Sequence, residues 1–296
     1  MADQSVFPSV DALPHDTRAL VLGHPVGHSL SPLMQDAWLD RAGLNGRYAA
    51  LDVAADDLAD TIAALRKRAG DGALAGFNVT VPHKEAVLDH LDSLSPSARQ
   101  MGAVNTVRIQ DGRLAGFNTD GIGFMRHLDQ TVPHWPVTRP PLVLGAGGAA
   151  RAVVSSLIAR EVPFVMLSNR TREKAEALAA ALGRGRVTVV DWEDRSAALA
   201  GAGLCVNTTA LGMAGQPPLA LDLGPAPADM VVYDIVYKPL HTPLLQAAAA
   251  RGLATVDGLG MLAGQGAAAF ELWFGVRPVY DAALKARLME ALGERD

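Results

Sequence analysis

Short apolar runs alternate with helical patterns along most of this 296-residue chain, and this alternation constrains the fold more than any other feature. Strands are predicted at residues 19–23, 76–82 and 103–109, because these apolar runs are bounded by turn residues. Residues 31–43 and 54–70 have the spacing of helices and end in glycine, which commonly follows a helix. Strands that alternate with helices in this way predict an α/β fold of parallel strands and crossover helices.

A proline-rich segment, TVPHWPVTRPP at residues 131–141, interrupts the alternation. Because the residue before a proline disfavours the helical conformation, we place a domain junction at or just before this segment. The segment after it is predicted to form a strand, a glycine turn and a helix. A further helical region is predicted from Asp257 onward. Further strands are predicted at residues 163–169, 186–191, 204–209 and 230–237.

Composition argues against several classes of partner. The net charge of −5 disfavours a nucleic-acid partner, which needs a basic face. No apolar run approaches the ~20 residues that span a bilayer, so no membrane association is expected. The single cysteine, Cys205, excludes an intrachain disulfide and suits a reducing, cytoplasmic location. Residues 1–17 lack the basic and apolar regions of a secretory signal and are expected to form a loose leader.

The segment LVLGAGGAAR places Gly145, Gly147 and Gly148 between a predicted strand and a predicted helix. Glycines there permit a tight turn and let backbone N–H groups approach a diphosphate at the helix N-terminus. Ala150 stands where the third glycine of a dinucleotide fingerprint would be. Glycines in a turn are weak evidence by themselves, but the strand before, the helix after and the second strand favour a dinucleotide site.

The end of the second strand of this half indicates which dinucleotide binds. NAD enzymes usually carry an acid there for the ribose 2′-hydroxyl, but this chain reads SNRTREK and has no acid at the strand end. Arg170 and Lys174 are four residues apart and face one way if a helix starts here. The alternative is a solvated basic helix start, although positive charge there opposes the helix dipole. Since Arg binds a 2′-phosphate through paired donors, we predict NADP.

Two serines, Ser29 and Ser31 in GHSLSP, follow the first predicted strand. Residues two apart in an extended chain point the same way, so both hydroxyls are expected on one side, available to a small anion or polyol. Other polar residues stand near the ends of later predicted strands: Asn78, Thr80, Lys84, Asn105, Asn118 and Asp120. Each alone fits a cap, a turn or a solvated side chain. Together they mark the ends of strands where α/β sheets bind ligands.

Several motifs in order carry a resemblance: GHPVGHSLSP, NVTVPHK, GAVNT, GFNTDGIG, GAGGAAR, NRT, NTTALGM, YDIVYKP and DGLGMLAGQGAAAFELW. With them the chain resembles the shikimate dehydrogenase family from about Ala19 to its C-terminal helices. The resemblance implies reversible NADPH-dependent reduction of 3-dehydroshikimate to shikimate, in chorismate and aromatic amino-acid biosynthesis. It also implies an α/β substrate domain of residues 18–125 with 258–296, to which the C-terminal helices return. Residues 126–257 would form a doubly wound, Rossmann-type NADP domain.

The resemblance assigns roles to individual residues. Ser29 and Ser31 match the pair that bonds the substrate carboxylate, with Tyr237 near it. Lys84 matches the catalytic lysine, and we expect Asp120 to act with it as a coupled proton-transfer pair. The residues that match contacts to the ring hydroxyls are Thr80, Asn105, Asp120 and Gln265. The residues implied at the NADP site are Gly145, Ala146, Gly147, Gly148, Ala149, Asn169, Arg170, Thr171, Lys174, Thr208, Met213, Gly258 and Met261.

Two different functions stand beside this assignment. A quinate/shikimate dehydrogenase of the same family, often using NAD, is the nearest enzyme alternative, and Ser31 and Arg170 argue against it. A non-catalytic NADP-binding sensor is the second. His24 and His28 are not expected to bind metal, because the Pro and Gly between them prevent a shared helix face. Cys205, Met213 and Met261 also fit an ordinary core. A monomer or a homodimer is expected.

Overall fold

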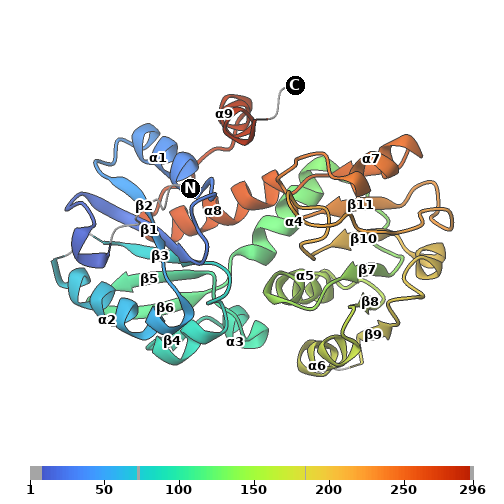
Figure 1. Cartoon of the computed structure of the whole chain (residues 1–296), viewed down its shortest axis with the longest axis horizontal. Coiled ribbons are helices and arrows are strands. Elements are labelled where there is room, and N and C mark those ends of the chain that lie inside the picture. The colour runs from blue at the N-terminus through green and yellow to red at the C-terminus, as the bar shows by residue number, and fades with distance from the viewer. Residues whose placement is uncertain (1–8, 72–73, 184, 294–296) are drawn as a thin grey trace. The chain divides into compact units, whose positions relative to one another are not determined.

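The computed structural model describes residues 9–71, 74–183 and 185–293, which divide into two compact units. The first unit comprises residues up to Thr119 together with Gly266–Gly293, and the second comprises Asp120–Gln265. Each contains its own sheet (Figure 1). The expected α/β class with two sheets is confirmed. The structure divides the chain at 119/120 and 265/266, whereas the predicted junctions lie at 125/126 and 257/258. The assignment of a substrate domain and an NADP domain stays a prediction.

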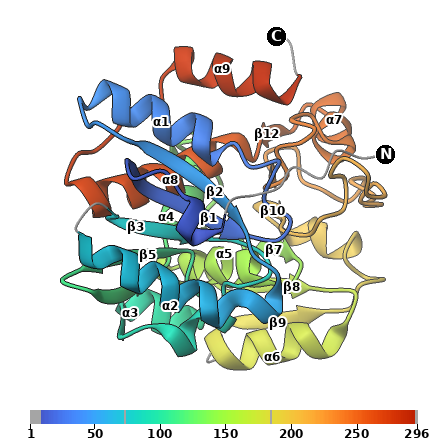
Figure 2. The same ribbon diagram turned by 60° about the vertical axis from the view of Figure 1, so that its left-hand side comes forward.

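The sheet of the first unit has the strand order β2-β1-β3-β5-β6-β4 among the described residues (Figure 1). Figure 2 shows β2, β1, β3 and β5 of this sheet from another side. Its strands are β1 (Thr17–Gly23), β2 (Arg47–Asp52), β3 (Gly76–Val79), β4 (Ser93–Leu94), β5 (Thr106–Gln110) and β6 (Arg113–Phe117). Its helices include α1 (Ser31–Arg41), α2 (Leu58–Arg68), α3 (Pro96–Met101), α9 (Ala282–Leu292) and the end of α8 (Leu259–Phe274). α2 packs its apolar side chains Leu58, Ile62 and Leu65 into the core cluster that contains Leu20 and Phe77.

The prediction of parallel strands is wrong for part of this sheet. β1 pairs in parallel with β2 and β3, but β5 is antiparallel to both β3 and β6. For β5 and β6 the cause is the two-residue hairpin loop that joins them, in which Asp111 and Gly112 have φ of 51° and 70°. Positive φ at both loop residues is the type I′ geometry that Asp-Gly favours, and it forces neighbouring strands to run in opposite directions.

The leader differs from its expectation. Residues 1–8 lie outside the described part of the chain, but residues 9–17 pack onto the first unit. Val10 and Leu13 are buried, and Arg68 of α2 donates to the carbonyl oxygens of Val10 and Pro14. The structure therefore shows no loose segment at residues 9–17, because two apolar side chains there enter the core.

The end of α8 and all of α9 belong to the first unit, so the chain returns to this unit at its C-terminal helices, while the start of α8 belongs to the second unit. The indole nitrogen of Trp38 in α1 donates to the carbonyl of Val279 at 2.9 Å, and that of Trp273 in α8 donates to Val107 in β5 at 2.9 Å. Gln35 of α1 donates to the carbonyl of Gly266 at 3.1 Å. These contacts join chain segments more than 160 residues apart, so they fix α8 and α9 against the first sheet.

The sheet of the second unit is parallel, with the order β12-β11-β10-β7-β8-β9 in the described chain. Its strands are β7 (Pro141–Leu144), β8 (Val165–Ser168), β9 (Val187–Val190), β10 (Leu204–Asn207), β11 (Val231–Asp234) and β12 (Ala254–Val256). Its helices include α4 (Asp120–Thr131), α5 (Gly148–Ala159), α6 (Arg172–Leu182), α7 (Pro243–Ala250) and the start of α8. This order is that of the doubly wound dinucleotide-binding fold, as predicted.

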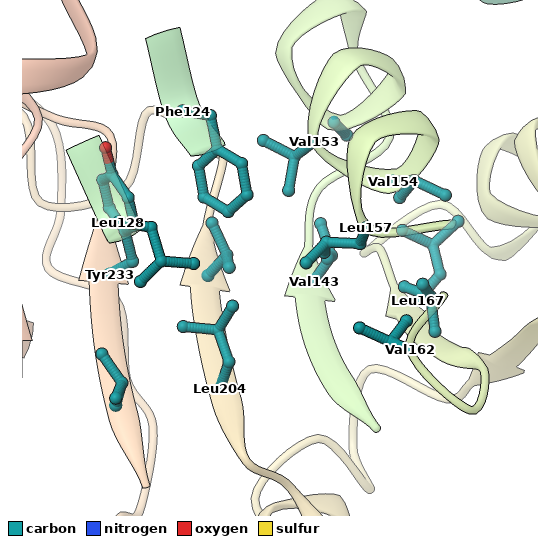
Figure 3. Close-up of a cluster of buried hydrophobic side chains, with 14 of the residues drawn as sticks. Phe124, Leu128, Val143, Val153, Val154, Leu157, Val162, Leu167, Leu204 and Tyr233 are labelled. Carbon is teal, nitrogen blue, oxygen red and sulfur yellow. The ribbon is translucent and has the colours of Figure 1, made fainter. Parts of the chain in front are cut away.

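Buried apolar side chains lie on both faces of this sheet, as a doubly wound fold requires. Figure 3 shows one face, where Val153 and Leu157 of α5 lie against Val143 of β7, with Phe124 of α4 and Tyr233 of β11 beside them. A second cluster, which includes Leu142 and Cys205, covers the other face. Every residue of β7, β8, β10 and β11 is therefore buried.

Candidate active site

Ser29 and Ser31 lie in the connection from β1 to α1, but not in an extended chain. Leu30 between them has φ of −81° and ψ of −6°, so the expectation that two extended residues present both hydroxyls on one side is wrong. Ser31 is buried as the first residue of α1, and its backbone N–H donates to the hydroxyl oxygen of Ser29 at 3.2 Å. The first turn of α1 contains no acid. Both hydroxyls thus stand at a helix N-terminus, where the helix dipole favours an anion.

Lys84 follows β3 in a loop that is held at several points. Its carbonyl accepts from the backbone N–H of Val104 at 2.8 Å, and its side chain is half-buried. The ring of His83 is buried and bonds through Nε2 to the carbonyl of Val53 at 2.7 Å. Thr80 begins the loop and packs so close to Gly23 that a Cβ there would meet its methyl group at 2.2 Å. The loop therefore fixes the backbone position from which Lys84 and Thr80 extend.

Asn105 is buried in a network of side-chain amides and hydroxyls. Its Oδ1 accepts from the backbone N–H of Thr119 at 2.8 Å, and its Nδ2 donates to the hydroxyl of Thr119 at 3.0 Å. Asn78 donates to the carbonyl of Asn105 at 3.0 Å and accepts from the hydroxyl of Tyr48 at 2.7 Å. Asn118 donates to the carbonyl of Ala103 at 3.0 Å. The contacts of Asn78 and Asn118 fit a structural role.

The sequence prediction missed Tyr48 and Thr119 in this network. Tyr48 lies in β2, and burial raises the pKa of its hydroxyl well above the ordinary value, so it stays neutral and donates to Asn78. Thr119 stands between Asn118 and Asp120 in the motif GFNTDGIG, which could have pointed to it. Thr119 determines how the amide of Asn105 is oriented, whereas Tyr48 holds Asn78, which donates to the backbone carbonyl of Asn105.

Three predicted substrate residues belong to the second unit. Asp120 is the buried first residue of α4. Gln265 lies on α8, and its side chain donates to the carbonyl of Leu262 at 3.1 Å. Tyr237 follows β11, and burial raises the pKa of its hydroxyl. The α4 and α8 backbones approach closely, because a Cβ on Gly123 would lie 2.5 Å from the nitrogen of Gln265.

The glycine turn after β7 has the shape that a phosphate group needs. Gly145 has φ of 111°, and a Cβ there would lie 2.5 Å from the Thr208 hydroxyl. Gly147 is exposed, has open space where a Cβ would be, and precedes α5 with no side chain capping the helix. The remaining predicted residues of this turn, Ala146, Gly148 and Ala149, are half-buried. Ala150 is fully buried, so its methyl group packs inside the unit.

The basic segment after β8 differs from its prediction. α6 begins at Arg172, with Thr171 before it in an extended conformation, so Arg170 and Lys174 do not lie on one helix face. Asn169 donates to the carbonyl of Thr171 at 2.8 Å and shapes the turn. Arg172 pairs with Glu176 at 2.8 Å and with Asp191. Glu176 and Asp191 offset the positive charge of Arg172 at the start of α6. The sequence alone did not explain why a positive charge stands there, where it opposes the helix dipole.

Arg170, Thr171 and Lys174 are all exposed. Among the residues that the structure describes, neither Arg170 nor Lys174 makes an ion pair. Arg170 also precedes the helix, so its guanidinium is outside the first turn of α6. Of the cations in this segment, it is the one at the strand end with its charge available to a phosphate.

The remaining predicted cofactor residues lie near the ends of β10 and β12. Thr208 follows β10, and its hydroxyl donates to the carbonyl of Leu144 at 2.6 Å. Met213 is 37% exposed, so it is not a core residue, whereas Met261 packs in the core cluster of the second unit. Gly258 is required by close packing, since a Cβ would lie 2.2 Å from the carbonyl oxygen of Ile235.

A buried carboxylate organises the ends of β10 and β11. Asp234 accepts from Asn207 at 2.9 Å, from the Thr242 hydroxyl at 2.7 Å and from the Val236 N–H at 3.1 Å. Burial raises the pKa of Asp234 more than these hydrogen bonds lower it. Asn207 in turn accepts from Thr209, so the network shapes the loop that begins with Thr208. Sequence reasoning missed this network.

Cys205 and His24 each occupy a structural position. Cys205 is fully buried in β10, and burial raises the pKa of its thiol to about 12, so a thiolate nucleophile is not available there. His24 bonds through Nδ1 to Asp52. Within residues 9–71, 74–183 and 185–293, no three His, Cys, Asp or Glu side chains are grouped to hold a metal. In the same residues no helix has the length and apolar character to cross a membrane.

Comparison with known proteins links this chain to one family along most of its length. Three family models match it: the shikimate dehydrogenase substrate binding domain at residues 21–107, shikimate / quinate 5-dehydrogenase at 137–212, and the shikimate 5′-dehydrogenase C-terminal domain at 258–286. The chain is 52% identical over 275 residues to a shikimate dehydrogenase (NADP(+)) of Rhodospirillum rubrum, a match that covers 91% of this chain and 95% of that protein.

Two further proteins show the same relationship. A shikimate dehydrogenase (NADP(+)) of Paramagnetospirillum magneticum is 53% identical over 268 residues, which cover 90% of this chain and 95% of the relative. The crystal structure of shikimate 5-dehydrogenase from Thermus thermophilus, in complex with NADP(H) and shikimate, has a TM-score of 0.81 and 42% identity. That match covers 94% of this chain and 98% of the Thermus thermophilus chain.

Proposed function

The chain belongs to the shikimate dehydrogenase family, and from this premise we propose that it is an NADP-dependent oxidoreductase that reversibly reduces 3-dehydroshikimate to shikimate. The observation that carries the proposal is the position of Ser29 and Ser31 at the N-terminus of α1, in a turn without an acid. Two hydroxyl donors and a favourable helix dipole suit a carboxylate. The Thermus thermophilus relative, whose structure contains shikimate and NADP(H), supports this assignment.

The residues present fit an anionic dinucleotide with an additional phosphate. Gly147 leaves open space before the uncapped N-terminus of α5, whose first turn contains no acid. A diphosphate at that position would accept from backbone N–H groups. Arg170 and Lys174 are exposed at the end of β8, and Arg170 would bind the 2′-phosphate that distinguishes NADP from NAD. Thr208 and Gly258 belong to the same proposed site.

When bound, NADP supplies the hydride acceptor for oxidation of the alcohol carbon and the hydride donor for the reverse reaction. Lys84 then takes the hydroxyl proton during oxidation and returns it to the carbonyl oxygen during reduction. We assign Asp120 as its partner in proton transfer.

The remaining substrate contacts set specificity. Thr80, Asn105 and Gln265 would bind the ring hydroxyls, and Tyr237 would donate to the carboxylate. Asn105 is oriented by Thr119, so its amide is fixed before substrate binds. A fixed amide rejects substrates with a different hydroxyl pattern, since its polar atoms would be left unpaired.

The test is a comparison of substrates and cofactors. Initial rates of oxidation are measured for shikimate and quinate, each with NADP⁺ and with NAD⁺. The proposal expects the highest kcat/KM for shikimate with NADP⁺. A higher kcat/KM for quinate with NAD⁺ would instead identify the chain as a quinate dehydrogenase. Binding of NADP⁺ without oxidation of either substrate would identify a sensor.

A further inference from the structure

Asp52, the last residue of β2, forms hydrogen bonds with the loop of residues 24–30, which leads from β1 to Ser31 and contains Ser29. Its Oδ1 lies 2.5 Å from Nδ1 of His24, and its Oδ2 accepts from the backbone N–H of Val26 at 3.0 Å. In the parallel pairing of β1 and β2, Asp52 stands opposite Gly23, from which the loop begins. One carboxylate therefore holds the loop at two points immediately after it leaves the sheet.

An unbroken series of hydrogen bonds runs from this carboxylate to both serines. The carbonyl of Val26, whose N–H donates to Asp52, accepts from the backbone N–H of Ser29 at 3.0 Å. The hydroxyl oxygen of Ser29 accepts from the backbone N–H of Ser31 at 3.2 Å. Val26 is 2% exposed and packs in a small apolar cluster with Val21. Asp52 and this packing thus determine where the turn from residue 26 to residue 29 closes.

The charges around Asp52 keep it as a hydrogen-bond acceptor. Burial alone raises the pKa of this carboxyl, but the bonds from His24 and Val26 and the positive charges of His24 and His83 lower it below its ordinary value. An ionised carboxylate has acceptor sites on both oxygens and can serve both donors at once. The side chain of His24 is 54% exposed and that of Asp52 19%, so the contact lies at the surface of the first unit.

We propose that Asp52 is a positioning residue for the carboxylate-binding pair Ser29 and Ser31. It acts through Val26 and the loop rather than by contact with substrate. The inference rests on the proposed function, in which these serines bind the shikimate carboxylate. Loss of the Asp52 side chain leaves the N–H of Val26 without its acceptor and releases His24. The serine hydroxyls then lose their fixed spacing, and the binding of a carboxylate is weakened more than the binding of the ring.

The test compares shikimate with its methyl ester, which keeps the ring hydroxyls and loses the negative charge. Asp52→Ala is expected to raise the KM for shikimate about tenfold and to leave kcat within about twofold. The same variant should leave kcat/KM for the methyl ester within about twofold of wild type. Asp52→Asn keeps an oxygen that accepts from Val26, so it should restore the KM for shikimate to within about threefold of wild type.

Asp92 provides a matched control in the same unit. Its carboxylate also accepts from one cationic side chain, Arg66 at 2.7 Å, and from one backbone N–H, that of Leu114 at 2.6 Å. It precedes β4, which lies at the opposite edge of the sheet from β2. Asp92→Ala should leave the KM for shikimate unchanged. If Asp52→Ala does not fold, Asp52→Ser, whose hydroxyl is too short to reach both donors, is measured in its place.

Two results would overturn the inference. One is an unchanged KM for shikimate in Asp52→Ala, and the other is an equal loss with shikimate and with the methyl ester, which would indicate general damage to the fold. The variant Ser29→Ala distinguishes failure of the positioning role of Asp52 from failure of the proposed function. If Ser29→Ala raises the KM for shikimate and Asp52→Ala does not, only the positioning role is wrong. If Ser29→Ala has no effect, the carboxylate assignment itself is wrong, and the role of Asp52 with it.

Discussion

Gly123 of α4 and Gln265 of α8 approach more closely than any side chain at position 123 would permit. A Cβ on Gly123 would lie 2.5 Å from the backbone nitrogen of Gln265 and 2.7 Å from the carbonyl oxygen of Met261. Both contacts are with backbone atoms, which cannot rotate away. Gln265 is a proposed substrate residue and Met261 a proposed cofactor residue, so this helix crossing determines the backbone position of both.

Gly123→Ala is therefore expected to destabilise the protein by about 1–3 kcal/mol, the usual cost of overpacking, and to lower kcat/KM for shikimate. Denaturation in urea and initial-rate kinetics measure the two effects. Gly201→Ala is the control, because a Cβ there meets nothing within 4 Å, and it should change neither quantity. Equal stability of the two variants would show that α4 and α8 can separate at little cost.

Lys84→Ala should lower kcat by roughly 10²-fold or more, since a positioned acid–base group contributes about that much. The Kd for shikimate, measured by calorimetry, should change little, because the substrate contacts assigned to other residues remain. Lys67→Ala, which removes an exposed lysine of α2, is the control and should keep wild-type turnover. Wild-type turnover in Lys84→Ala would show that another group transfers the proton.

Asp120→Asn should also lower kcat, because it removes the carboxylate that we assign as the partner of Lys84 in proton transfer. The measurement is kcat for Asp120→Asn and wild type side by side, at a pH at which both are stable. A wild-type kcat in Asp120→Asn would contradict the assignment of Asp120 to the proton-transfer pair.

Arg170→Ala should reduce the preference for NADP⁺ over NAD⁺ by about tenfold or more, the value of a hydrogen bond between charged groups. The measured quantity is the ratio of kcat/KM with the two cofactors. Arg172→Ala is the control, since Glu176 and Asp191 already offset that charge, and it should keep the ratio. Screening should shrink the preference of wild type at high salt, because the Debye length falls from ~10 Å at 0.1 M to ~3 Å at 1 M. If both variants keep the wild-type ratio, Lys174 becomes the next candidate.

Cys205 should resist thiol reagents in the folded protein. Burial raises the pKa of its thiol from 9.0 to about 12, which lowers the thiolate fraction near neutral pH by about 10³-fold. Since it is the one cysteine in the sequence, the labelling rate reports on it alone. The rate should rise by about that factor in denaturant. Rapid labelling under native conditions would show that β10 opens far more readily than a buried central strand should.

The central strands of the second unit could be predicted from the sequence, whereas α4, α7 and β12 were not predicted, and the reason is physical. The strands β7, β8, β10 and β11 are buried on both faces, so runs such as PLVL are apolar throughout and easily recognised. The first unit was harder to predict. β2 has the sequence RYAALD, lies at the sheet edge and is only partly buried, so its pattern is weak. The hairpin after β5 carries an Asp-Gly pair that specifies the antiparallel pairing, and the prediction of parallel strands did not take it into account.

In the candidate site, the sequence predicted which residues take part but not how their side chains are oriented. The motifs around Ser29, Lys84 and Arg170 predicted carboxylate binding, proton transfer and phosphate binding, because a sequence shows which side chains carry a hydroxyl group or a charge. The orientations were not visible. That Asp52 would bond to Val26, that Thr119 would orient Asn105, and that Asp191 would offset Arg172 all depend on contacts between residues distant in sequence. Such pairings follow from strand register and packing, which no local pattern specifies.

The central claim is that the chain reduces 3-dehydroshikimate with NADPH. The most direct measurement follows the absorbance of reduced nicotinamide after the purified protein is mixed with both compounds, while the product is quantified by chromatography. The account predicts that one shikimate forms for each NADPH consumed, and that Lys84→Ala forms shikimate at least about 10²-fold more slowly. NADPH that is bound but not consumed, or consumed without formation of shikimate, would contradict it.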